Sequence, residues 1–119
     1  MSGAKASVTA QLAPAALRRV RELVEAELHC DVTVDELALA AGLSRAHFSR
    51  AFRAATGETP YGYLRRRRVE RARRLLTGTD LEAATIAGLT GFSSPSHFGR
   101  VFKTVTGVTP ASYRRRLRA

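Results

Sequence analysis

The chain has 119 residues, the length of one small domain or of two very small lobes. Lys and Arg number 20 against 10 Asp and Glu, so the net charge of +10 favours a partner of negative charge. A chain of this size has little room for a deep substrate cavity, which argues against an enzyme. No apolar stretch approaches the roughly 18 residues of a membrane span, and no secretory signal opens the sequence. One cysteine cannot form an internal disulfide, which fits a reducing cytoplasm.

Apolar residues recur at helical spacing along most of the chain, and no segment alternates with period two for long enough to form a strand. Proline at first helical positions, Ser or Thr caps and terminal glycines mark the helix ends. The clearest cap is Thr33, with Glu36 three residues later in a capping-box pattern. The sequence therefore predicts an all-α fold of about seven helices, at residues 14–29, 33–42, 44–57, 60–77, 81–90, 94–106 and 110–118.

The positive charge is confined to the second half of the chain. Residues 1–60 contain seven bases and seven acids, whereas residues 61–119 contain thirteen bases and three acids. The run Arg65–Arg68 begins this excess, and arginine favours phosphate because its guanidinium group binds phosphate oxygens in a bidentate manner. A solvated helix face is the plain alternative for such a run.

An internal repeat with a spacing of about 50 residues is the strongest feature of the sequence. Each copy contains a short helix, a glycine turn and a longer helix, which is a helix-turn-helix pattern. One residue is inserted in the second copy near Ser93 and Ser94. The paired blocks are Leu37-Ala38-x-x-x-Gly42-Leu43-Ser44 with Ile86-Ala87-x-x-x-Gly91-Phe92-Ser93, His47-Phe48-x-Arg50-x-Phe52 with His97-Phe98-x-Arg100-x-Phe102, Thr56-Gly57-x-Thr59-Pro60 with Thr106-Gly107-x-Thr109-Pro110, and Tyr63 with Tyr113.

Helical periodicity divides each longer helix into a core face and an outward face. The predicted core positions are Phe48, Ala51, Phe52 and Ala55 in one copy and Phe98, Val101, Phe102 and Val105 in the other. The outward positions are Ala46, Ser49, Arg50 and Arg53, then Ser96, Gly99, Arg100 and Lys103. Small residues beside long basic side chains, with no acidic residue, are typical of a helix that lies in a DNA major groove. A solvated face is the alternative for either helix alone.

The repeat predicts four parts: a loose tail (residues 1–13), a first helix-turn-helix lobe (14–59), a linker helix (60–77) and a second helix-turn-helix lobe (78–119). The linker helix would be roughly 27 Å long, and successive major grooves lie about 34 Å apart. With the widths of the lobes added, a monomer is expected to reach adjacent major grooves and to read two half-sites. A tandem repeat does not require a palindromic site.

From about Leu17 to Arg118 the sequence resembles the DNA-binding domain of AraC/XylS-type bacterial transcription regulators. The resemblance rests on Ile86-Ala87-x-x-x-Gly91-Phe92-Ser93, His97-Phe98-x-Arg100-x-Phe102-Lys103, Gly107-x-Thr109-Pro110-x-x-Tyr113-Arg114 and the linker stretch Arg68-Val69-x-x-Ala72-x-x-Leu75-Leu76. It implies a sequence-specific regulator of transcription, in particular an activator that also contacts RNA polymerase in the bacterial cytoplasm and nucleoid. In length the chain resembles the stand-alone, MarA/SoxS-like members, or an isolated domain of a longer regulator.

The resemblance also implies base contacts from the third and sixth helices. By position these contacts fall on Ala46, Ser49, Arg50, Ser96, His97 and Arg100. Of these only His97 lies at the edge of the outward face. Because Ala46 and Gly99 have no side-chain donor, readout there is limited to methyl contact or DNA shape. DNA backbone contacts are expected from Ser44, Arg45, Arg53, Arg65, Arg66, Arg68, Ser94, Lys103, Arg114 and Arg115.

Two other functions remain open at this stage. One is a basic protein that coats DNA or RNA without specificity, and the other is a module whose Arg-rich linker helix binds an acidic protein. No cofactor or metal is expected under any of these functions, since His29, Cys30, His47 and His97 lack the spacing of zinc ligands. Cys30 is expected to be half-buried, and the two repeated tyrosines are expected to anchor the core.

Overall fold

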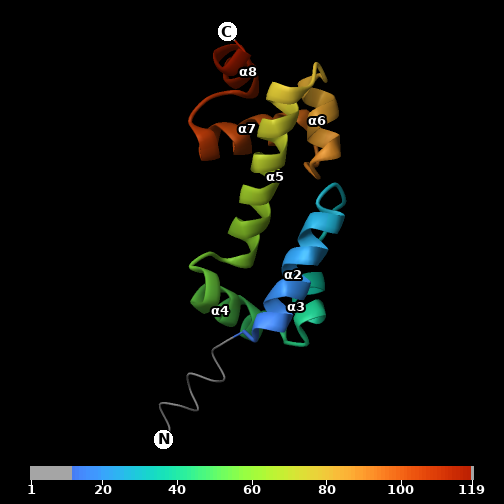
Figure 1. The fold of residues 1–119 in the computed structure, drawn as a ribbon, viewed down its shortest axis with the longest axis vertical. Coiled ribbons are helices and arrows are strands. Elements are labelled where there is room, and N and C mark those ends of the chain that lie inside the picture. Colours follow the sequence, from blue (N-terminus) through green and yellow to red (C-terminus); the bar gives the residue numbers. More distant parts are fainter. Residues whose placement is uncertain (1–11, 119) are drawn as a thin grey trace, which may run out of the picture. The chain divides into compact units, whose positions relative to one another are not determined.

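The computed structural model describes residues 12–118, and within this range every regular element is a helix. All seven predicted helices are present, and their ends agree with the prediction to within two residues, so the all-α prediction is confirmed (Figure 1). They are α2 (Pro14–Glu27), α3 (Val34–Ala41), α4 (Arg45–Thr56), α5 (Pro60–Gly78), α6 (Ala83–Leu89), α7 (Pro95–Thr106) and α8 (Pro110–Arg118).

The described residues divide into two compact units. The first unit comprises the chain up to Glu27 together with Val32–Leu64, and the second comprises Leu28–Asp31 together with the chain from Arg65 onward. The division runs through α5, so each unit contains part of the predicted linker helix. Residues 1–11 of the predicted tail lie outside the described residues, and Leu12, the second-last residue of the tail, is buried.

In the first unit, α2 packs against α3, and α3 packs against α4. Aromatic rings continue this core along α4 into the start of α5. The ring centroids of Phe48 and Phe52 are 5.5 Å apart, and those of Phe52 and Tyr63 are 5.4 Å apart in an edge-on arrangement. Tyr63 is buried, which confirms its predicted role as a core anchor.

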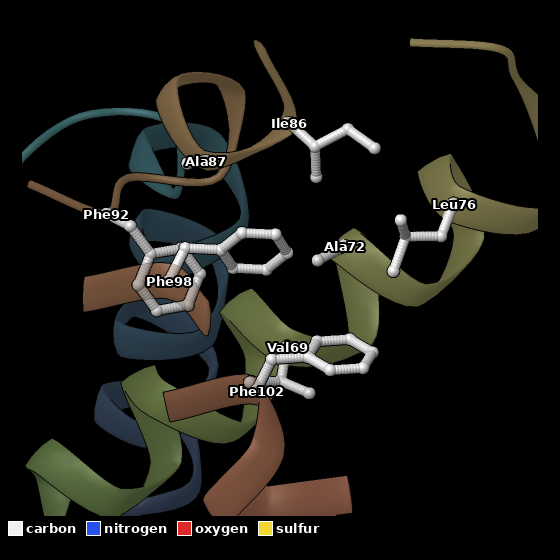
Figure 2. Close-up of a cluster of buried hydrophobic side chains, with 8 residues drawn as sticks. All are labelled: Val69, Ala72, Leu76, Ile86, Ala87, Phe92, Phe98 and Phe102. Atoms are coloured by element: carbon white, nitrogen blue, oxygen red, sulfur yellow. The ribbon is translucent and has the colours of Figure 1, made fainter. Parts of the chain in front are cut away.

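The second unit repeats this ring series around its own core (Figure 2). Phe98 and Phe102 lie with centroids 5.6 Å apart, and Phe102 meets Tyr113 edge-on at 5.3 Å. In Figure 2, Phe102 lies beside Val69 of α5. The eight residues drawn form one buried cluster, and Tyr113 packs against it: Val69, Ala72, Leu76, Ile86, Ala87, Phe92, Phe98 and Phe102.

The repeated Thr-Gly-x-Thr-Pro sequence ends one helix and begins the next in both units. The Thr56 hydroxyl donates to Phe52 O at 2.8 Å, and the Thr106 hydroxyl donates to Phe102 O at 2.8 Å. The hydroxyl of the second threonine then caps the following helix, since Thr59 Oγ1 accepts from Gly62 N at 3.0 Å. Thr109 accepts from Ser112 N at 3.1 Å in the same way.

The segment Leu28–Asp31 belongs to the second unit because it packs against the turn before α7. Arg68 Nη2 donates to Cys30 O at 3.2 Å. Gly91 has φ +83°, and a Cβ atom at this position would lie 2.4 Å from Leu28 O and 3.1 Å from Cys30 O. The turn of the second helix-turn-helix therefore requires glycine both for its backbone angle and for its close neighbours.

Three packing predictions from the sequence are wrong. Ala55 and Val105 are exposed instead of buried. Both lie in the last turn of their helices, beyond the point where Phe52 and Phe102 close the core, so the apolar face is shorter than periodicity predicts. Cys30 is exposed instead of half-buried, because the contacts of its segment are made by backbone carbonyls.

Replacing Gly88 with alanine is expected to raise the free energy of unfolding by about 0.5–1 kcal/mol. Gly88 lies inside α6, is exposed, and has no atom within 4 Å of the position of an added Cβ. Alanine would lower the conformational entropy of the unfolded chain at no steric cost. Thermal unfolding followed by circular dichroism would measure the effect, and a lower midpoint would contradict it.

Candidate nucleic-acid interface

A serine hydroxyl fixes the start of the second helix in each helix-turn-helix. Ser44 Oγ accepts from His47 N at 3.2 Å at the start of α4, and Ser94 Oγ accepts from His97 N at 3.0 Å at the start of α7. Both serines are predicted DNA-backbone contacts. Each hydroxyl still has its own proton, so it can cap its helix and donate to a phosphate oxygen at the same time.

The outward face of α4 presents basic side chains and small residues. Ala46, Arg50 and Arg53 are exposed, and Ser49 is half-buried beside them. Arg45 Nη1 lies 3.4 Å from Asp35 Oδ1, with both side chains more than 60% exposed. An exposed pair of this kind contributes little to stability, so Arg45 can exchange the carboxylate for a phosphate at small cost. The helix itself contains no acidic residue.

The corresponding face of α7 has the same character. Ser96, Arg100 and Lys103 are exposed, while His97 and Gly99 are half-buried. Nothing lies within 4 Å of a Cβ built on Gly99, so bare backbone is accessible at this position. The helix contains no acidic residue. In each unit, therefore, the second helix has an acid-free face with the predicted base-reading residues, and His97 lies at the edge of this face in α7.

Several of the predicted backbone-contacting arginines are bound within the protein. Arg114 Nε donates to Leu76 O at 2.8 Å and its Nη2 to Thr79 O at 3.1 Å, which satisfies carbonyls at the end of α5. Arg68 holds Cys30 O as described above. Arg66 pairs with Glu70 at 3.1 Å, and Arg67 also pairs with Glu70. Arg65 is half-buried, and Arg53, Lys103 and Arg115 are exposed.

The contacts of Arg68 and Arg114 have no signal in the sequence, because each joins residues more than 30 positions apart. Sequence reasoning also missed Ser93, whose Oγ lies 3.2 Å from His97 Nδ1. The inserted residue in the second turn is the signal that could have identified it.

Among residues 12–118, one group of residues with metal-ligand chemistry lies at the end of α2 and just beyond it. The ligand atoms of Glu27, His29 and Cys30 lie within 4.8 Å of one another, and all three side chains are exposed. Exposed groups of this kind occur commonly without an ion, and the protein is not assigned a metal site on this basis. The expected absence of a metal stays a prediction.

Two helix-turn-helix units, each exposing a basic and acid-free second helix, define the protein as a DNA-binding domain of the double helix-turn-helix class. A family model described as a helix-turn-helix domain matches residues 37–116. The chain belongs to the AraC-type DNA-binding domains of transcription regulators, a non-enzymatic family.

Solved structures agree with this assignment. The DNA-binding domain of AdpA, a global transcriptional factor crystallised in complex with a target DNA, is 37% identical with a TM-score of 0.81, and the match covers 87% of this chain and 92% of that one. An AraC-type regulator from Chromobacterium violaceum is 30% identical with a TM-score of 0.78, over 86% of this chain and 91% of that one.

The transcriptional activator NphR from a Rhodococcus species is 39% identical over 77 residues. This match covers 64% of the chain and 23% of NphR, so the chain spans about a quarter of the length of this relative.

No helix among residues 12–118 has both the length and the apolar character that a membrane span requires.

Proposed function

We propose that the protein regulates transcription by reading two half-sites of double-stranded DNA, with α4 in one major groove and α7 in the next. This proposal rests on the repeated outward face of the two helices, in which basic side chains and small residues are exposed and acidic residues are absent. The length of α5 supports adjacent grooves, since 19 residues rise about 28 Å along a helix.

The base-reading residues in this proposal are Ala46, Ser49 and Arg50 of α4 and Ser96, His97 and Arg100 of α7. Arg50 and Arg100 are exposed at equivalent positions of the repeat, and an arginine can bind guanine O6 and N7 together. Gly99 occupies the position of Ser49, and Ala46 occupies the position of Ser96, so each helix has one position at which readout is limited to methyl contact or DNA shape. Phosphate contacts are assigned to Ser44, Ser94, Arg45, Arg53, Lys103 and Arg115.

In the cell we propose an activator that works in the bacterial cytoplasm, binds DNA as a monomer and contacts RNA polymerase. The name of NphR supports activation. The tandem relation of the two helix-turn-helix copies supports a monomer, because one chain presents both reading helices. Sedimentation of the chain with its selected duplex tests this point, and a complex of two chains on one duplex would overturn it.

The function is tested by selection from random duplex DNA at about 150 mM salt, followed by affinity for the winning duplex and a scrambled one. We expect the wild-type chain to bind the winner at least ~10³-fold more tightly. Arg50→Ala and Arg100→Ala are each expected to cost about 1–3 kcal/mol on the winner and to relax base preference at one position.

Arg74→Ala is the matched control, because it removes the same charge from an exposed position of α5. It is expected to weaken both duplexes about equally. If Arg50→Ala behaves like this control, the reading face of α4 is wrongly assigned. If the wild-type chain enriches no sequence, a coating protein or a protein-binding module becomes the better explanation.

A further inference from the structure

The turn of the second helix-turn-helix has one residue more than that of the first. In the first unit the turn runs Gly42-Leu43-Ser44, and Ser44 caps α4. In the second it runs Gly91-Phe92-Ser93-Ser94, and Ser94 provides the cap of α7. The additional residue, Ser93, therefore does not cap the helix, and its hydroxyl oxygen lies 3.2 Å from Nδ1 of His97.

The same turn also restrains the His97 ring from a second direction. The rings of Phe92 and His97 meet edge-on, with centroids 5.7 Å apart and planes at 73°. Phe92 is itself part of the buried cluster and lies 5.1 Å from the ring of Phe98. The imidazole is thus held between a fixed aromatic ring and a hydroxyl. The first unit has Leu43 where the second has Phe92, so it lacks this aromatic contact.

A hydrogen bond at one imidazole nitrogen decides what the other nitrogen can do. Neutral imidazole has one N–H donor and one acceptor nitrogen. If the Ser93 hydroxyl donates to Nδ1, the proton of the ring is on Nε2, which becomes a donor. If Nδ1–H donates to Ser93, Nε2 becomes an acceptor. The direction of the hydrogen bond across this 3.2 Å contact therefore decides whether Nε2 donates or accepts.

DNA offers a donor at Nε2 many more partners than it offers an acceptor. Phosphate oxygens only accept, and guanine N7 and O6, adenine N7 and thymine O4 all accept in the major groove. Amino groups of adenine and cytosine are the donors there. His97 is half-buried at the edge of the α7 face that carries Arg100, which leaves part of its ring accessible.

We propose that Ser93 is a positioning residue that donates to His97 Nδ1 and holds His97 as an Nε2–H donor. The Nε2–H group donates to a hydrogen-bond acceptor on DNA, which is either a purine N7 or O6 atom or a phosphate oxygen. The direction of this hydrogen bond and the contact with DNA both rest on the proposed function, whereas the Ser93–His97 pair itself exists without DNA.

The tautomer is tested on the DNA-free chain by ¹⁵N–¹H correlation spectra of the histidine rings at about pH 8, with His97→Gln used for assignment. The wild-type chain is expected to show mainly the Nε2–H form of His97. Ser93→Ala is expected to shift this signature toward a mixture of tautomers, and Ser93→Thr, which retains a hydroxyl, is expected to restore it. An Nδ1–H form in the wild type, or a ring signature unchanged by Ser93→Ala, would overturn the proposal.

The DNA step is tested with the duplex selected for the wild-type chain. Ser93→Ala is expected to lose about tenfold in affinity for this duplex, and Ser93→Thr is expected to recover most of the loss. An altered tautomer with unchanged affinity and base preference would overturn the DNA contact. Failure of the wild-type chain to select any duplex would overturn the proposed function, while the ring spectra would still decide the tautomer.

Whether the acceptor is a base edge or a phosphate oxygen is decided by comparing the affinities for two duplexes, the winner and one altered in the α7 half-site. If His97 contacts a base edge, Ser93→Ala reduces the discrimination between the winner and a duplex altered in the α7 half-site. If it contacts a phosphate, Ser93→Ala weakens the binding of both duplexes by the same factor and leaves the salt dependence unchanged, because a neutral imidazole releases no counterion.

Discussion

Replacing Gly91 with alanine is expected to lower the free energy of unfolding by about 4 kcal/mol, which is a large effect for one methyl group. The backbone at Gly91 has φ +83°, where a side chain costs about 1–2 kcal/mol. The new Cβ would also lie 2.4 Å from Leu28 O and 2.8 Å from Arg68 Nε, so the 28–31 segment must move away. Urea unfolding followed by circular dichroism would measure the loss.

Gly42 provides the matched control, because it is the equivalent residue of the first unit. Its φ is +73°, yet nothing lies within 4 Å of an added Cβ. Gly42→Ala is therefore expected to cost only the backbone term of about 1–2 kcal/mol. Equal losses in the two variants would show that the close approach of Leu28 O is not what requires glycine at position 91.

Replacing Phe102 with alanine is expected to cost about 3–5 kcal/mol, because it removes a fully buried ring from the centre of the second unit. The ring packs between Phe98 and Tyr113, with centroids 5.6 and 5.3 Å away. Differential scanning calorimetry would record the change as a lower transition temperature.

Val105→Ala is the control for this prediction, since Val105 lies one turn further along α7 and is 39% exposed. Its expected cost is within about 0.5 kcal/mol, the range for surface substitutions. A loss comparable with that of Phe102→Ala would mean that the core extends to the end of α7, as the periodicity of the sequence predicts.

The helices were predictable because their start and stop signals are local. Thr33 and Glu36 form the capping box that their spacing predicts, with the Glu36 carboxylate accepting from Thr33 N at 3.0 Å. Proline, glycine and serine at the other boundaries act within a few residues of themselves. Periodicity also identified the outward faces of α4 and α7, since each face depends only on residues within one helix.

The sequence offered no such signal for contacts between distant residues. Arg68 and Arg114 are predicted from the sequence to contact phosphates, and the structure adds that their guanidinium groups hold backbone carbonyls of Cys30, Leu76 and Thr79. A carbonyl leaves no pattern in the side chains, so this use of an arginine is invisible to periodicity and composition. Ala55 and Val105 show the related limit, because periodicity gives the direction of an apolar face but not where the neighbouring element ends.

The second unit of this protein is not encoded by one continuous stretch of sequence. Its turn at Gly91 is closed by Leu28 and Cys30, which come from the other half of the chain. A fragment cut within α5 would keep every residue of the second repeat, yet it would lose the carbonyl that Arg68 binds and the wall against which Gly91 packs. The two copies of the motif are therefore not interchangeable modules, and swapping the second copy between relatives would require the 28–31 segment to be transferred with it.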